Sequence, residues 1–380
     1  MLKSLLSNQN RRLFANLIIF HLAYLWFRSF SSSMLSPHFL QEGFSIAQII
    51  FGNVAVYAGA VAVALLIRRY PSRISWAWSI ITSFIYILLV IDLRSSWQLY
   101  LASFIGGLEI ALFYIPYNVA HYRLTPTHRT SYSSAILFSL FPIVSLIAPL
   151  AAGILANIDY LYIWLFSGLF FVISVTLVKW QPKFEIKPKL LADWEYIKAT
   201  RWLVLLQSLW ETMPFVVVGV FGLYFIQTPL YYGTYLAYLS LASILANLFF
   251  GHLSDKKQKR LIFLYPIVII MGITALLFPL ALNSLTLWLV VTGIISFLMP
   301  LFWNFSTSLF VDAHPEHERT FTIRELTLNI GRTVGTFLLF LNFYLQEKPT
   351  YIFYFLAAVM FTYAAYIFYQ TKITRRYRYN

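Results

Sequence analysis

Four charged residues lie near the middle of long apolar stretches of the sequence: Arg28, Glu109, Glu211 and Arg332. Ionised side chains are costly in an apolar environment, so such residues usually face a cavity or an oppositely charged partner. Because two bases and two acids balance in sign, one interpretation is two structural ion pairs, Arg28 with Glu109 and Arg332 with Glu211. The other interpretation is that one carboxyl group takes up a proton during a working cycle, since burial disfavours its charged form.

Helical spacing places each of these residues on a stripe of polar or aromatic side chains. The stripes are His21, Tyr24, Arg28 and Ser32; Gly106, Glu109, Phe113 and Tyr117; Gln207, Ser208, Glu211 and Pro214; Pro300, Asn304, Thr307 and Ser308; and Glu325, Asn329 and Arg332. The stripe around Glu211 is the more polar one, which makes Glu211 the first candidate for a proton carrier and Glu109 the second. His21 is a third candidate because the reference pKa of histidine is near neutrality, and a hydrogen-bonded structural histidine is the alternative.

Aromatic residues gather at similar depths in these stretches. Binding pockets for drug-like or amphipathic ligands are apolar with a few polar anchors. The predicted substrate-binding residues are Arg28, Tyr24, Tyr114, Tyr117, Gln207, Trp210, Trp303, Asn304 and Arg332, with Trp26 as a further aromatic candidate. For each aromatic residue the alternative is packing or contact with lipid.

The composition predicts the environment that positions these residues. The chain has 380 residues, of which 60% are hydrophobic and only 11% charged, whereas a soluble domain carries about 25% charged residues. We therefore expect an all-α integral membrane protein, because a membrane helix needs about 20 apolar residues and these runs are continuous rather than alternating. The twelve predicted helices span residues 13–36, 46–67, 74–93, 97–120, 132–156, 159–179, 203–226, 232–252, 260–282, 285–311, 321–345 and 349–370.

The formal net charge of +14 follows a topological pattern. Nearly all Lys and Arg residues outside the helices lie in loops on the side of the N-terminus, and only Arg94 and Lys348 fall in the opposite loops. Basic loops stay in the cytoplasm, so both termini are expected there and the bacterial inner membrane is the expected location. The leader MLKSLLSNQNRRLF lacks a small-residue cleavage site and is interpreted as part of the mature chain. The charge then requires no nucleic-acid partner.

The longest loop divides the predicted helices into two sets of six. The expected organisation is a bundle over residues 1–180, a linker over 181–202 and a second bundle over 203–380. The loops TPTHRTSYSS and HPEHERTFTI occupy the same place in each half and align Arg129 with Arg319, as internal repeats in transporters do. The linker sequence LLADWEYIKATRW is amphipathic enough for a short surface helix, and a plain connector is the alternative.

The stretch GHLSDKKQKR between the eighth and ninth predicted helices resembles the loop motif of the major facilitator superfamily. Gly251, Asp255, Lys256, Lys259 and Arg260 match the pattern, and Gln258 stands where a glycine is usual. The corresponding loop of the first half is degenerate, with Ala64 and Arg68 in place of Gly and Asp. APLAAGIL in the fifth helix is similar to a Gly-Pro motif of exporters, and PHFLQEGFSIAQI looks like the short outer turn between the first two helices.

This resemblance implies two six-helix bundles that rock about a central site, with helices 1, 4, 7 and 10 around a cavity and helices 2, 5, 8 and 11 between the bundles. The implied function is secondary transport, and we expect a proton-coupled exporter of a small organic or amphipathic solute. A proton-coupled importer of a sugar or organic acid, or a non-transporting membrane sensor, is the alternative. The predicted gating residues, which would latch the cytoplasmic face, are Gly251, Asp255, Lys256, Arg260, Arg129 and Arg319; their alternative role is to mark an inside loop.

Several chemistries are not expected. The sequence has no cysteine, which excludes disulfides, thiolate metal sites and cysteine nucleophiles. It has no P-loop, GxGxxG or HExxH pattern and no set of a nucleophile and a base, so neither a cofactor nor an enzyme activity is expected. The cluster HPEHE could bind a metal ion, but a solvated loop is the preferred interpretation. A monomer would suffice for this architecture.

Overall fold

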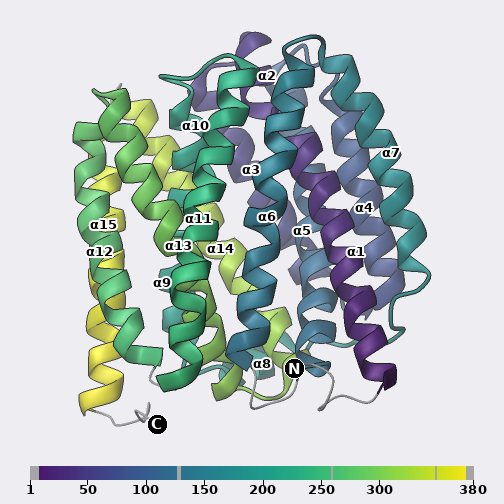
Figure 1. Ribbon diagram of the computed structural model, residues 1–380, viewed down its shortest axis with the longest axis vertical. Coiled ribbons are helices and arrows are strands. Elements are labelled where there is room, and N and C mark those ends of the chain that lie inside the picture. Colours follow the sequence, from purple (N-terminus) through teal and green to yellow (C-terminus); the bar gives the residue numbers. More distant parts are fainter. Residues whose placement is uncertain (1–7, 126–129, 258–259, 347–348, 374–380) are drawn as a thin grey trace.

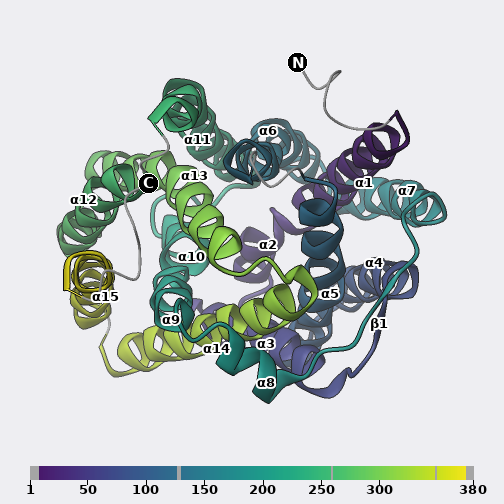
Figure 2. The ribbon, with the colours of Figure 1, turned by 90° about the horizontal axis from the view of Figure 1, so that it is seen from below.

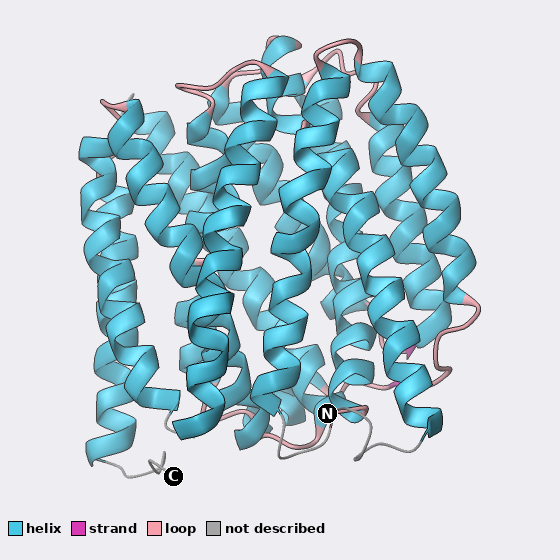
Figure 3. Ribbon diagram, in the orientation of Figure 1, coloured by secondary structure: helices cyan, strands magenta, loops and turns pink. Residues whose placement is uncertain are grey.

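The computed structural model describes residues 8–125, 130–257, 260–346 and 349–373. Within them the chain is helical almost throughout, and the long helices lie side by side in one bundle (Figures 1 and 3). Eleven helical segments of the described residues are long and apolar enough to cross a membrane. The start of α1 and the end of α15 lie at the same end of the bundle (Figure 1). The expectation of an all-α membrane protein is therefore confirmed.

The helices that precede the linker are α1 (Asn8–Ser32), α2 (Leu35–Gln41), α3 (Ile46–Leu66), α4 (Ser72–Leu89), α5 (Ser96–Arg123), α6 (Thr130–Ala156) and α7 (Tyr160–Val178). Polar caps fix several of their starts: Ser45 and Gln48 form a capping box at α3, and Ser95 and Asp159 cap α5 and α7. The predicted first helix was too long at its end, because the chain turns after Ser32 and forms the short α2 in the segment predicted as an outer turn.

The helices that follow the linker are α9 (Arg201–Trp210), the π-helix η3 (Met213–Val217), α10 (Val218–Gly222), α11 (Pro229–Lys257), α12 (Arg260–Ala281), α13 (Leu285–Ala313), α14 (His317–Leu345), α15 (Tyr351–Phe368) and the π-helix η4 (Tyr369–Ile373). The predicted seventh helix is thus broken into α9, η3 and α10. Pro214 lies in the π-helical turn, where its missing N–H and its ring prevent the regular α-helical hydrogen bond.

The most extensive contacts between the first set of helices and the second are those of α3 with α14 and of α6 with α11. Small residues permit the second contact, because a Cβ on Gly153 would lie 2.6 Å from the Pro229 carbonyl oxygen and one on Gly233 would lie 2.5 Å from that of Pro149. These are the second, fifth, eighth and eleventh long helices of the chain, as the resemblance implied for the contact between halves. Seen from the end that carries the linker, α5, α13 and α14 converge (Figure 2).

The linker is not a free loop, because both of its parts form secondary structure that contacts the bundle. Its first part forms strand β2 (Glu185–Ile186), which pairs antiparallel with strand β1 (Tyr70–Pro71) ahead of α4. Its second part contains the short helix α8 (Leu190–Tyr196), which packs against α14. The predicted surface helix is therefore present, although it has only two turns.

Candidate functional site

The first buried ion pair joins α1 to α5. Arg28 Nε contacts Glu109 Oε1, and the Tyr24 hydroxyl donates to Glu109 Oε2 at 2.5 Å. Glu109 is 1% exposed, whereas the Arg28 side chain is 29% exposed. Tyr24 and Arg28 are one helical turn apart, so the sequence stripe places both donors on the face of α1 that meets Glu109.

Next to this pair is a cluster of buried rings. The Tyr24 ring stacks on Phe113 with 3.5 Å between centroids, and the His21 ring lies 4.1 Å from that of Tyr117. Both ring nitrogens of His21 and the hydroxyl of Tyr117 are buried without a hydrogen-bond partner among the described residues. Since buried polar groups are nearly always satisfied by protein or water, bound water is the expected partner of these groups.

The second buried ion pair joins α9 to α14. Arg332 Nε and Nη2 donate to Glu211 Oε2 at 2.7 and 2.6 Å. The other oxygen, Glu211 Oε1, accepts from Gln207 Nε2 and Trp303 Nε1, both at 2.8 Å. Arg332 Nη1 also donates to Asn329 Oδ1 at 3.1 Å. Glu211 therefore has four donors, and three different helices supply them.

Local backbone features hold this second cluster in place. Glu211 follows the last residue of α9, directly before the turn that contains Pro214. On the other side, α14 approaches α9 so closely that a Cβ on Gly331 would overlap Ser208 Oγ and one on Gly335 would overlap Thr212 Oγ1. Gly331 and Gly335 thus permit a close contact within the second set of helices, and this contact positions Arg332 against Glu211.

A further tyrosine lies beside the first pair. Tyr114 on α5 lies edge-on to Tyr24, with 6.3 Å between the ring centroids, and edge-on to His21 at 6.2 Å. Sequence reasoning had named Tyr114 as a candidate.

A second aromatic set crosses from α6 to α13. The Trp303 ring stacks on Phe138 of α6 at 6.0 Å and on Phe215 of η3 at 5.5 Å between centroids. The Arg332 guanidinium lies 5.1 Å from the centre of the Phe215 ring. This aromatic set therefore spans helices of both sets, with Arg332 beside it.

Other predicted site residues have structural contacts instead. Trp210 is fully buried and donates to Met299 Sδ at 3.4 Å. Asn304 is buried and accepts from Ser308 Oγ at 3.4 Å. Trp26 packs edge-on against Phe170 of α7, away from the second set of helices. None of these three points to the other ion pair.

At the end that carries the linker, α5 and α14 contact each other directly. Asn118 Nδ2 donates to Glu325 Oε1 at 3.1 Å, and Arg123 forms an ion pair with Glu318. The Tyr122 and Phe321 rings stack at 5.0 Å between centroids. Sequence reasoning missed this set, although Glu325 was noted on the stripe of Arg332.

The second part of the linker, which contains α8, packs beside this contact between α5 and α14. Arg319 Nε donates to the buried Asp193 at 2.9 Å, and its guanidinium lies 4.4 Å from the centre of the Tyr196 ring. His314 Nε2 is hydrogen-bonded to Thr200 Oγ1 at 2.8 Å, and burial lowers the pKa of the His314 imidazole to about 4. Of the predicted gating residues, Arg319 thus contacts the linker.

The remaining gating predictions concern residues whose side chains are not described. Gly251, Asp255 and Lys256 lie on the last turns of α11, and Arg260 is the first residue of α12. Arg129 lies outside the described residues. Among the described residues, no group of three or more His, Cys, Asp or Glu side chains could hold a metal ion.

The fold is that of a multi-pass helical membrane protein in which each of two sets of helices buries an ion pair between helices. A family model described as Major Facilitator Superfamily matches residues 17–336, and the chain belongs to that family. Membership implies secondary transport of a small-molecule substrate through a membrane, and it points to a transporter rather than an enzyme.

Solved structures of the same fold are similar over nearly the whole chain. A bacterial homologue of the iron transporter ferroportin in its outward-facing state has a TM-score of 0.71 at 14% identity, over 95% of this chain and 100% of that chain. A POT family transporter in complex with a thioalcohol-conjugated peptide has a TM-score of 0.69 at 13% identity, over 95% and 96%. The human organic anion transporter MFSD10 has 0.67 at 11% identity, over 94% and 99%. No curated protein sequence matched the chain.

Proposed function

We propose that this protein is a proton-coupled secondary transporter that exports a small amphipathic organic solute by alternating access. The helices of residues 1–180 and 203–380 would move as two bundles joined by the linker 181–202. The protein would work as a monomer in the bacterial inner membrane with both termini in the cytoplasm, as the basic loops favour. The observation that carries the proposal is the Arg28–Glu109–Tyr24 cluster, a buried carboxylate whose basic partner is partly exposed.

The number of donors around each carboxylate favours Glu109 over Glu211 as the proton carrier. Hydrogen bonds and opposite charges stabilise the charged form of a carboxylate. Glu211 accepts from four donors on three helices, whereas Glu109 is held by Arg28 and Tyr24 of α1 and by Ser83 of α4. A proton on Glu109 would release Arg28 and loosen the contact between α1 and α5. The unsatisfied His21 and Tyr117, next to Tyr24, would carry that proton through bound water.

A second candidate, import of an organic acid together with a proton, is favoured by the exposed part of Arg28. An anion would bind the guanidinium that protonated Glu109 releases, as MFSD10 is named for organic anion transport. The two candidates predict opposite pH dependences of ligand binding. An anion imported with a proton binds more tightly at low pH, whereas a solute exported in exchange for a proton binds more tightly at high pH.

A ligand screen tests the proposal. Thermal unfolding of the purified wild type, Glu109→Gln, Glu211→Gln and the exposed control Glu42→Gln would be followed with amphipathic cations, neutral amphiphiles and organic acids at pH 6 and pH 8. We expect an amphipathic ligand that stabilises the wild type more at pH 8, and a loss of this difference in Glu109→Gln alone. An organic acid that stabilises more at pH 6 would move the function to the second candidate. Equal stabilisation at both pH values would contradict coupling at Glu109.

The direction of transport is tested by a flux measurement. In vesicles with an imposed ligand gradient and an internal pH dye, the exporter moves protons against the ligand flow, whereas the importer moves both the same way. Ligand flux without proton movement would contradict coupling.

A further inference from the structure

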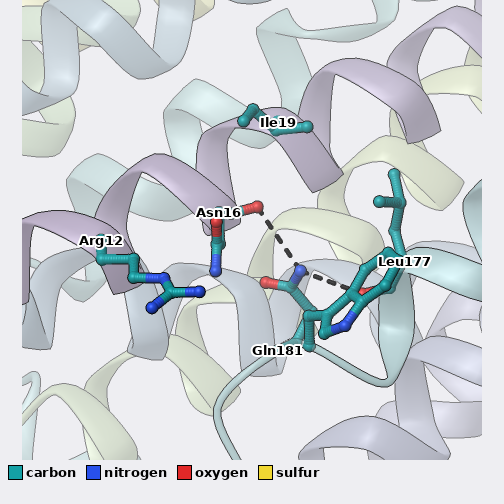
Figure 4. A pocket seen from close by; sticks show the side chains of 6 residues that line it. Arg12, Asn16, Ile19, Leu177 and Gln181 are labelled. Atoms are coloured by element: carbon teal, nitrogen blue, oxygen red, sulfur yellow. Dashed lines mark hydrogen bonds between the residues drawn. The ribbon is translucent and has the colours of Figure 1, made fainter. Parts of the chain in front are cut away.

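A pocket that none of the preceding functions uses lies between α1 and the end of α7 (Figure 4). It is near the start of the first membrane span and the end of the span formed by α7. Its volume is about 230 Å³, and it is lined by Arg12, Asn16, Ile19, Leu177, Trp180 and Gln181. The lining contains an arginine and no acidic residue. The two termini of the described chain and the linker lie at this end of the bundle (Figure 1).

The pocket is polar at one end and apolar at the other. Arg12, Asn16 and Ile19 lie on one face of α1, and Ile19 is about 10 Å further along the helix than Arg12, toward the middle of the span. Ile19 and Trp180 are both more than half exposed. Tryptophan at this depth is typical of the interface between head groups and hydrocarbon. The order of cation, polar groups and apolar side chains along the helix matches the order of groups in a phospholipid.

One buried polar atom of the pocket lacks a partner. Gln181 is 1% exposed, and its Nε2 donates to the carbonyl oxygens of Leu177 at 3.1 Å and Asn16 at 3.4 Å, as Figure 4 shows. Its Oε1 has no hydrogen-bond partner among the described residues. The backbone carbonyl of Gln181 accepts from Arg73 Nε at 2.7 Å, which fixes the backbone at this position. A buried acceptor of this kind requires a donor from a ligand or water.

We propose that this pocket binds the head group of an anionic phospholipid that carries hydroxyl groups, such as phosphatidylglycerol, from the membrane leaflet next to the linker. Arg12 holds the phosphate by charge-assisted hydrogen bonds. A head-group hydroxyl donates to Gln181 Oε1. The start of an acyl chain lies along Ile19, Leu177 and Trp180. Basic pockets between membrane helices are a known way of selecting anionic lipids.

Lipid selectivity tests the inference. The full-length protein in nanodiscs of phosphatidylcholine would receive increasing fractions of phosphatidylglycerol, phosphatidic acid or phosphatidylethanolamine, with thermal unfolding and native mass spectrometry of bound lipid as readouts. We expect phosphatidylglycerol to bind about five- to tenfold more tightly than phosphatidylcholine, since a single basic residue near the surface contributes on that scale. Equal retention of the two lipids would overturn the inference.

Two variants and a control locate the site. Arg12→Gln should remove most of the selectivity, whereas Arg69→Gln, an exposed arginine outside the pocket lining at the same end, should retain it. Equal losses in both would mean that surface charge alone attracts the lipid, which contradicts a site. In Gln181→Leu the ratio of phosphatidylglycerol to phosphatidic acid binding should fall toward one, a ratio that is independent of any general loss of stability. An unchanged ratio would overturn the role of Gln181.

A last arm distinguishes the lipid from a soluble anion. Inorganic phosphate and glycerol 3-phosphate share the phosphate chemistry but have no acyl chain. Neither should displace phosphatidylglycerol at millimolar concentration. If either stabilises the protein as well as the lipid does, and this depends on Arg12, the ligand is a soluble phosphate and the lipid proposal is wrong.

Discussion

The two buried ion pairs have the same chemistry but different surroundings. In the first set of helices, Glu109 is held by Arg28 and Tyr24 of α1 and by Ser83 of α4, and its partner Arg28 is 29% exposed. In the second set, Glu211 accepts from donors on three helices, and its partner Arg332 is 12% exposed. Water therefore reaches the guanidinium of the first pair more readily than that of the second. This difference favours proton coupling at the first pair and a supporting role for the second.

The largest effect should come from removing the charge in the second pair. Glu211→Gln leaves Arg332 buried without its counter-charge, which costs about 3–5 kcal/mol of unfolding free energy for a buried pair. Glu109→Gln should cost clearly less, because water can reach Arg28. Thermal and denaturant unfolding of both variants, with Glu42→Gln as the control, measure the difference.

A double variant sharpens this prediction. Glu211→Gln combined with Arg332→Gln removes both charges, so part of the lost stability should return. If the double variant is as unstable as the sum of the single variants, or if Glu109→Gln is the more destabilising change, the comparison of the two pairs is wrong.

The next effect concerns coupling. Typical coupled sites change each other's affinity by about 5–150-fold, and a factor in this range should separate ligand binding at pH 6 from binding at pH 8 in the wild type. Glu109→Gln should abolish the factor, and Glu211→Gln, tested at a temperature where it stays folded, should retain it. Titration of ligand affinity against pH measures both. A pH dependence that survives in Glu109→Gln and disappears in Glu211→Gln would reverse the assignment.

A smaller effect tests why the second pair is rigid. Gly331→Ala would place a methyl group against Ser208 and push α14 away from α9, at a cost of about 1–3 kcal/mol for overpacking. Gly168→Ala is the matched control, because no atom lies within 4 Å of the new Cβ, and alanine favours a helix by about 0.5–1 kcal/mol over glycine. If Gly331→Ala is as stable as Gly168→Ala, the close approach of the helices does not hold Arg332.

The sequence predicts the charges of this arrangement better than its geometry. Sign and depth alone suggested the partners Arg28–Glu109 and Arg332–Glu211, since an unpaired charge at bilayer depth is costly. The stripe around Glu211 also placed Gln207 correctly. The hydrogen bond from Trp303 to Glu211 could not be predicted, because an aromatic residue in an apolar helix has no periodic signal that separates a hydrogen-bonding role from packing.

Contacts between distant segments were the least predictable. Asn118 and Glu325 are far apart in the chain, and each lies on a helix whose partner depends on the packing of the whole bundle. The strand pairing of the linker with the segment before α4 is only two residues long and carries no strand pattern. The length of the apolar runs was sufficient to predict the membrane helices. It contains no information on which helix ends contact each other.

The smallest effect concerns His314, which follows the last residue of α13. Its Nε2 is hydrogen-bonded to Thr200 Oγ1 of the linker, and the side chain is buried. The pKa of His314 is lowered to about 4 by burial, from an unfolded value near 6.5. Between these values the unfolded chain binds a proton that the folded chain does not, so stability should fall as the pH decreases from about 6.5 to 4.

His314→Gln removes this contribution, and the fall in melting temperature of a few degrees over this pH range should become shallower than in the wild type. Differential scanning fluorimetry from pH 7.5 to 4.5 measures the two slopes, and subtraction cancels the other titrating groups. Superimposable slopes would mean that the imidazole of His314 is protonated equally in both states.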